Sequence, residues 1–133
     1  MMKQLSIFIE NKRGAILRIM NVLKESDIQI IASTISDTQD FGIYRIICDN
    51  PEKAYRVLKD QDAPVTLSEV FAIYIDDTPG EAARVVAIFA EAGINISYMY
   101  SFLLSGKGIL VFRTDNPELT SEVISRNGLH EFD

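Results

Sequence analysis

The sequence predicts an α+β protein built from two tandem βαββαβ units, each with an antiparallel sheet and helices on one face. Strand-like and helix-like segments follow one another in the order β-α-β-β-α-β, judged by the spacing of apolar residues. The same order returns 66 residues further along without a gap. Fourteen residues are identical at that offset, among them the helix-start tetrads at 49–52 and 115–118. Such self-similarity indicates a tandem duplication, with repeat 1 at residues 1–67 and repeat 2 at residues 68–133.

The first repeat opens with an alternating strand at 5–9, and a turn at 11–14 leads into a helix over 15–25. The apolar stripe of this helix consists of Ile16, Ile19, Met20 and Leu23. Alternation and β-branched residues predict further strands at 28–35, 43–48 and 64–67, with a polar hairpin loop at 36–40.

A second helix begins at Pro51, behind an Asn50 N-cap, and runs to about Gln61. The second repeat starts with a strand at 71–75 and a helix over 81–92. The stripe of that helix consists of Ala82, Val85, Val86 and Phe89.

The turn before this helix carries strong local signals. Thr78 is suited to the N-cap, Pro79 to the first helical position and Glu81 to the third, which together predict a capping box. A helix N-terminus also presents N–H donors and partial positive charge, which suit a carboxylate or phosphate. From these residues alone, a well-formed turn and an anion site are both open interpretations.

Composition bounds the function classes. With 133 residues, a net charge of −6 and a pI near 4.7, the chain is a poor match for nucleic acid or an anionic membrane. The apolar run at the N-terminus is too short for a signal peptide, and no stretch is long enough to span a membrane. We therefore expect a cytoplasmic protein.

No catalytic constellation stands out. Cys48 is the single cysteine and alternates with apolar residues, which favours a buried small hydrophobe over a nucleophile. His130 has no cysteine or acid at catalytic spacing and is expected at the surface. Paired carboxylates and metal-ligand sets are also missing from the pattern, so we expect no enzyme, no cofactor and no metal.

The split βαβ order is the ferredoxin-like arrangement. Within it, the pattern Asp77-x-Pro79-Gly80, a helix, and then Gly93 to Ile96 (Gly-Ile-Asn-Ile) resembles the ACT domain, a small-ligand regulatory module of amino-acid metabolism. The likeness covers nearly the whole chain, once per repeat. The first repeat departs from the motif, with Asn11 for Asp, Arg13 for Pro and Gln29 for Asn.

The resemblance implies that an amino acid binds where two such units meet, at the first strand–helix turn and the start of the second strand. The residues it implies for the ligand are Asn11, Lys12, Arg13, Gly14, Ala15, Ile16, Gln29, Ile30, Asp77, Thr78, Pro79, Gly80, Glu81, Asn95 and Ile96.

The chemistry of these residues predicts unequal roles for the two turns. A capping box at the second turn would occupy N–H donors, so the first turn is the expected carboxylate site and Asp77 the expected ammonium site. The amides of Gln29 and Asn95 both donate and accept, which suits a zwitterion. The alternative is that these amides satisfy neighbouring backbone.

We therefore expect a regulatory protein that senses an amino acid at the interface of two ACT-like units and modulates a metabolic enzyme. A ferredoxin-like scaffold without a ligand, or an interaction subunit of an enzyme complex, is the alternative. Phe8, Tyr74, Tyr98 and Tyr100 lie on the sheet face opposite the core residues. They indicate that this open face is covered by the other unit, by a second chain in a homodimer, or by the target enzyme. Core packing with the opposite polarity of the two faces is the alternative.

Overall fold

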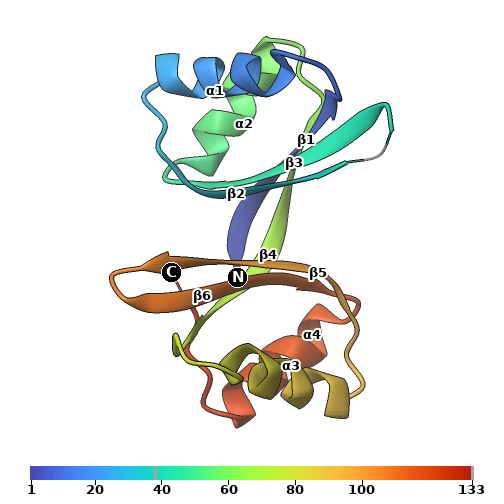
Figure 1. Cartoon of the computed structure of the whole chain (residues 1–133), viewed down its shortest axis with the longest axis vertical. Coiled ribbons are helices and arrows are strands. Elements are labelled where there is room, and N and C mark those ends of the chain that lie inside the picture. Colours follow the sequence, from blue (N-terminus) through green and yellow to red (C-terminus); the bar gives the residue numbers. More distant parts are fainter. Residues whose placement is uncertain (38, 133) are drawn as a thin grey trace. The chain divides into compact units, whose positions relative to one another are not determined.

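The computed structural model describes residues 1–37 and 39–132 (Figure 1). Thr38, in the predicted loop at 36–40, and Asp133, the last residue of repeat 2, lie outside the described residues. The chain divides into two compact units. The first unit is Lys3–Glu69, and the second unit comprises Val70–Asp133 together with Met1–Met2.

The first unit has the predicted order of elements. These are β1 (Met2–Glu10), α1 (Ala15–Glu25), β2 (Ile30–Asp37), β3 (Phe41–Cys48), α2 (Pro51–Asp60) and the start of β4 (Val65–Ile75). The strands lie in the order β2-β3-β1-β4. β3 is antiparallel to both β1 and β2, and α1 and α2 cover one face (Figure 1). This is the ferredoxin-like arrangement.

The second unit repeats that plan. Its elements are the end of β4, α3 (Glu81–Glu91), β5 (Ile96–Leu104), β6 (Lys107–Thr114) and α4 (Pro117–Arg126), with strand order β4-β6-β5. The segment after α4 takes the place of the fourth strand, because the Tyr74 N–H donates to the His130 carbonyl at 2.9 Å. At the matching place in the first unit, the Phe8 N–H donates to the Pro64 carbonyl at 2.9 Å. The strand segments predicted at 64–67 and 71–75 belong to one strand, β4, which begins at Val65.

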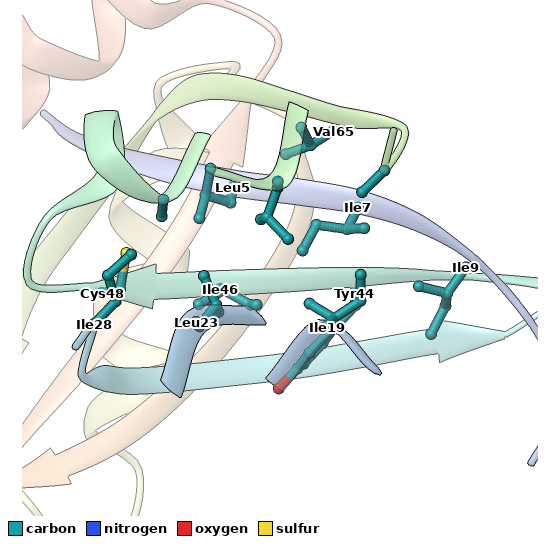
Figure 2. Packing of buried hydrophobic residues seen from close by; sticks show 13 residues of the cluster. Leu5, Ile7, Ile9, Ile19, Leu23, Ile28, Tyr44, Ile46, Cys48 and Val65 are labelled. Carbon is teal, nitrogen blue, oxygen red and sulfur yellow. The ribbon is translucent and has the colours of Figure 1, made fainter. Parts of the chain in front are cut away.

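The core of the first unit is mostly aliphatic, with the ring of Tyr44 buried among the aliphatic side chains (Figure 2). Leu5 and Ile46 from the sheet and Leu23 from α1 are fully buried. Cys48 is buried with them, which confirms the prediction of a small core hydrophobe, and burial raises the pKa of its thiol.

The core of the second unit is aromatic at the equivalent positions. Phe71, Phe89 and Phe112 replace Leu5, Leu23 and Ile46, and all three are buried. The Phe112 ring lies 5.6 Å from that of Phe71 and 5.1 Å from that of Phe89, between centroids. These are the spacings of favourable aromatic pairs.

Two of the predicted stripe positions in α1 are not core. Ile16 and Met20 are exposed, as is Ala82 in α3, whereas Ile19, Leu23, Val85 and Phe89 are buried. The apolar stripe is therefore wider than the face that each sheet covers.

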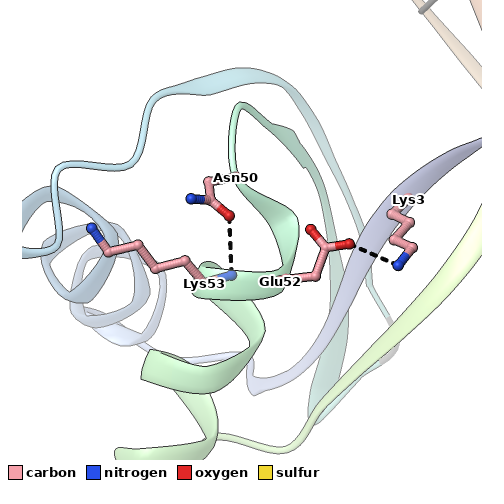
Figure 3. Close-up of polar contacts among 4 residues, drawn as sticks. All are labelled: Lys3, Asn50, Glu52 and Lys53. Carbon is pink, nitrogen blue, oxygen red and sulfur yellow. Dashed lines mark hydrogen bonds and ion pairs between the residues drawn. The ribbon is translucent and has the colours of Figure 1, made fainter.

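The N-cap predicted for α2 is confirmed. The Asn50 side chain accepts a hydrogen bond from the Lys53 N–H at 3.2 Å (Figure 3), and Pro51 is the first helical residue. Nearby, Lys3 Nζ lies 2.7 Å from Glu52 Oε1. This ion pair lowers the pKa of the Glu52 carboxyl and raises that of Lys3, chiefly through the hydrogen bond between them.

The predicted capping box at Thr78 and Glu81 is wrong. The N-cap of α3 is Gly80, with a left-handed φ of 86°, and no side chain caps the helix. Thr78 contributes only its carbonyl, which accepts from the Glu81 N–H at 3.3 Å. Because a left-handed residue redirects the chain from strand to helix here, α3 starts later than the motif suggests and Glu81 becomes its first residue.

None of the described helices is long and apolar enough to cross a membrane. In the same described residues, no group of three or more His, Cys, Asp or Glu side chains is placed to hold a metal ion.

Candidate ligand site

The two strand–helix turns have the same backbone. Gly14 and Gly80 are the N-caps, with φ of 89° and 86°, and neither helix has a side-chain cap. In both turns the first helical N–H bonds back to the carbonyl three residues earlier, at 3.3 Å. The next two N–H groups have no partner inside the helix. Capping therefore does not distinguish the turns, and the predicted division into a carboxylate turn and an ammonium turn loses that basis.

The first turn is fastened to the β2–β3 hairpin. The Asn11 N–H donates to the Asp40 carbonyl at 2.9 Å, and Asn11 Nδ2 donates to the Gln39 carbonyl at 3.4 Å. Lys12 Nζ pairs with Glu10 Oε2 at 3.2 Å, while Arg13 is exposed. Asn11 thus holds the turn against the hairpin through two hydrogen bonds.

The second turn is exposed to the same degree as the first. Asp77, Thr78 and Pro79 all face solvent. The Glu81 side chain is only 12% exposed, and its carboxylate accepts a hydrogen bond from Arg84 Nε.

Gln29 and Asn95 precede the second strand of each unit. The Gln29 N–H donates to the Asp49 carboxylate at 3.1 Å, and the Asn95 N–H donates to Asp115 at 3.0 Å. Gln29 Nε2 donates to the Ile30 carbonyl at 3.1 Å, so this amide hydrogen-bonds to the adjacent backbone. β2 begins at Ile30 rather than at the predicted residue 28.

Of the predicted residues of the first unit, Lys12 and Ala15 line one pocket and Gln29 and Ile30 line another, while Asn11, Arg13, Gly14 and Ile16 line neither of these two. The turn and the strand start lie at opposite ends of α1, whose eleven residues span about 16 Å. One pocket, of about 440 Å³, includes Gln29 and Ile30 at the strand start. The other, here named the turn pocket, has a volume of about 470 Å³ and is lined by Phe8, Ile9, Glu10, Lys12, Ala15, Arg18, Ile19, Phe41, Asp62 and Pro64.

The turn pocket combines an apolar lining with charges of both signs. Lys12 and Arg18 are its cations, and Glu10 and Asp62 its carboxylates. Arg18 Nη2 donates to the Gln61 carbonyl at 2.8 Å, which ties α1 to the loop after α2. Such a lining suits a small ligand with an anionic group, a cationic group and an apolar part.

The second unit has a smaller pocket at the equivalent place. Its volume is about 180 Å³, and its lining is Tyr74, Ile75, Asp76, Arg84, Lys107, Gly128, Leu129 and His130. Seven of these eight residues match residues of the turn pocket at the 66-residue offset. An adjoining hollow of about 670 Å³ shares Tyr74, Lys107 and His130 but is not lined by Arg84.

Arg18 is the main pocket residue that the sequence reasoning left out. Phe41, Asp62 and Pro64 were also missed, because they come from segments far from the turn. A signal for Arg18 was present: it is identical to Arg84 at the repeat offset, on an exposed helix face where core packing does not explain the identity.

Comparison with known proteins identifies the family. A family model for the ACT domain pair matches residues 1–132. Protein BT0572 from Bacteroides thetaiotaomicron has a crystal structure that is 36% identical in sequence, with a TM-score of 0.93 over 98% of this chain and 90% of that one. The search of curated proteins gives no match.

More distant structures show the fold alone. The ligand-free regulatory subunit of aspartate kinase from Thermus thermophilus is 13% identical, with a TM-score of 0.68 over 93% of this chain and 91% of that one. The corresponding subunit from Thermus flavus is 16% identical, with a TM-score of 0.62 over 93% and 88%.

Proposed function

Because the chain belongs to the ACT domain pair family, we propose that it binds a free amino acid and thereby regulates an enzyme of amino-acid metabolism. One observation carries the proposal: the turn pocket places charges of both signs around an apolar lining. The aspartate kinase regulatory subunits among the structures of similar fold support an enzyme as the target. The activity belongs in the cytoplasm, where free amino acids meet the enzymes that make them.

The pocket suits an α-amino acid in size and charge. Its volume of about 470 Å³ lies within the range of roughly 300–1,000 Å³ typical of small-molecule sites. A carboxylate pairs best with a guanidinium, which Arg18 supplies, and an ammonium pairs with a carboxylate. Lys12 already neutralises Glu10, so Asp62 is the acid left for the ammonium.

Regulation requires that the ligand favours one state of the protein over another. The partner that would sense this difference is the target enzyme or a second copy of the chain. Phe8 and Tyr74, which are 57% and 39% exposed, support such a partner at the open face of a sheet.

A thermal-shift screen of the twenty amino acids tests the proposal. A ligand that binds only the native state stabilises it by about 2.7 kcal/mol at a hundred times its dissociation constant. We expect one amino acid, or a chemically related few, to raise the melting temperature. A flat response across the set at millimolar concentration would contradict the proposal and favour the scaffold.

A further inference from the structure

We infer that the turn pocket is a carboxylate site completed by Arg18, and that in the second unit the Glu81 carboxylate already occupies the equivalent arginine, Arg84. The inference rests on the proposed function for the ligand class. It extends that function by assigning one group of the ligand to one side chain and by limiting each chain to a single open site.

The two units differ at one critical position beside an identical arginine. Arg18 and Arg84 are each the fourth residue of their helix. The first residue is Ala15 in α1 and Glu81 in α3. Residues three apart lie on the same face of a helix, so position 15 or 81 decides whether the arginine has a neighbouring carboxylate.

In the second unit that carboxylate is held in place. Glu81 accepts a hydrogen bond from Arg84 Nε, and the Glu81 side chain is 12% exposed whereas that of Arg84 is 60% exposed. The carboxylate is thus the sheltered member of the pair. It sits beside an arginine that lines the smaller pocket of about 180 Å³.

In the first unit the methyl group of Ala15 leaves this place open. Within the described residues, the bond recorded for the Arg18 side chain runs from Nη2 to the Gln61 carbonyl. A guanidinium has five N–H donors and binds carboxylates through two of them in parallel. A ligand carboxylate can therefore take, in the turn pocket, the role that Glu81 plays for Arg84.

The other charges around the turn pocket agree with a zwitterion rather than a simple anion. Lys12 is paired with Glu10, which reduces its pull on a second anion. Asp62 lines the pocket, whereas the second unit has Gly128 at that position. The first unit thus has, at this position, an acid that can meet an ammonium group, whereas the acid of the smaller pocket is Asp76, the counterpart of Glu10.

Calorimetric titration of the full chain tests the inference with three probes of one shape. L-leucine carries both charges, 4-methylpentanoate only the carboxylate, and 3-methylbutylamine only the ammonium; the apolar lining of the pocket suits their shared side chain. We expect Arg18→Gln to weaken L-leucine and 4-methylpentanoate by roughly tenfold or more, the loss of one charge-assisted contact. The amine should be unaffected.

Exchanging the residues at positions 15 and 81 between the two units gives the most decisive test. Ala15→Glu should supply an internal carboxylate to Arg18 and abolish binding of both carboxylate probes, and the neutral Ala15→Gln should weaken them less. Glu81→Ala should open a second, weaker site and raise the stoichiometry from one towards two. Ala82→Glu adds one glutamate, as Ala15→Glu does, but at an exposed helix position directly after Glu81. It serves as the control, and we expect it to leave binding unchanged.

The outcomes separate this inference from the proposed function. If L-leucine or another amino acid binds equally well to wild type, Arg18→Gln and Ala15→Glu, the assigned site is wrong while amino-acid sensing stands. If 4-methylpentanoate binds through Arg18 but no amino acid does, the carboxylate site stands and the sensing proposal fails. If neither carboxylate probe binds the wild type, or Glu81→Ala keeps a stoichiometry of one, the inference is overturned in its first or second half.

Discussion

At three core positions the first unit has aliphatic side chains where the second unit has rings, and at a fourth position the order is reversed, with Tyr44 in the first unit and Leu110 in the second. Leu5, Leu23 and Ile46 are replaced by Phe71, Phe89 and Phe112 at the same fold positions. The backbone order is nonetheless the same in both units. The fold therefore depends on where apolar residues recur along the chain, while the choice among apolar residues is free to change after duplication.

A second difference concerns one buried polar pair. Thr114 Oγ1 and Thr120 Oγ1 lie 2.8 Å apart, and Thr120 donates its proton to the Asn116 carbonyl at 2.7 Å. Thr114 must therefore be the donor to Thr120, since a hydroxyl has one proton. The equivalent residues of the first unit, Cys48 and Ala54, are apolar and buried. The two positions are therefore both polar in the second unit and both apolar in the first.

The largest expected effect comes from the aromatic core. Phe112→Ala removes a ring that contacts both Phe71 and Phe89, and we expect a loss of about 3–5 kcal/mol in the free energy of unfolding. Ile46→Ala, its counterpart, removes fewer atoms and should cost less. Urea denaturation followed by circular dichroism measures both, with Ser121→Ala on the exposed face of α4 as control. Equal losses would show that the rings add nothing to the second core.

The threonine pair gives the next largest effect. Thr120→Ala leaves the buried Thr114 hydroxyl without its acceptor and should cost about 1–3 kcal/mol. The double variant Thr114→Cys/Thr120→Ala copies the first unit and should recover most of that loss. A double-mutant cycle of unfolding free energies measures the coupling. Additive losses in the cycle would mean that the two hydroxyls do not depend on each other.

A smaller effect is expected where α1 and α3 end. Asp27 and Gly93 are equivalent and both have positive φ, 57° and 78°. A Cβ at Gly93 would meet no atom within 4 Å, so Gly93→Asp should cost only the backbone strain, about 1 kcal/mol. Asp27→Gly should shift the melting temperature in the opposite direction. Two shifts of the same sign would show that contacts, and not backbone conformation, decide the residue here.

The smallest effect concerns the exposed Lys3–Glu52 ion pair of the first unit. The second unit lacks this pair, because Glu69 stands at the position equivalent to Lys3. Because Lys3 lowers the pKa of Glu52, Lys3→Met should raise that pKa towards its ordinary value, as followed by NMR titration. The lowered pKa stabilises the fold above the unfolded-state pKa of Glu52, and this contribution is lost as pH falls through the folded-state pKa.

At alkaline pH, Lys3 gives the same ion pair the opposite pH dependence, so that stability falls as pH rises. The raised pKa of Lys3 stabilises the fold below its unfolded-state value, and the contribution is lost as pH rises through the folded-state pKa. Glu52→Gln should lower the pKa of Lys3. An unchanged carboxyl titration in Lys3→Met would show that the pair does not persist in solution.

Local signals predicted the elements well and the site only in part. Asn50 and Pro51 mark the start of α2 because their effects are confined to one turn of helix. The capping box failed because the left-handed Gly80 depends on how the chain leaves β4, which a four-residue pattern does not contain. Arg18 is marked by its identity with Arg84 at the repeat offset, but its place in a pocket could not be predicted, because Phe41 and Asp62 join it only through the folded sheet and the end of α2.

The boundary between the two units also determines which unit is completed first during synthesis on the ribosome. The strands of the first unit, including the start of β4, are all present once residue 69 has been synthesised. The second unit still needs the segment that donates to β4, where the Phe132 N–H bonds to the Ala72 carbonyl at 2.8 Å. At cellular rates of about 5–20 residues per second, synthesis from residue 70 to 132 takes roughly 3–13 s. During synthesis, the first unit, which has the turn pocket, therefore has all its strands several seconds before the second unit, in which Glu81 pairs with Arg84.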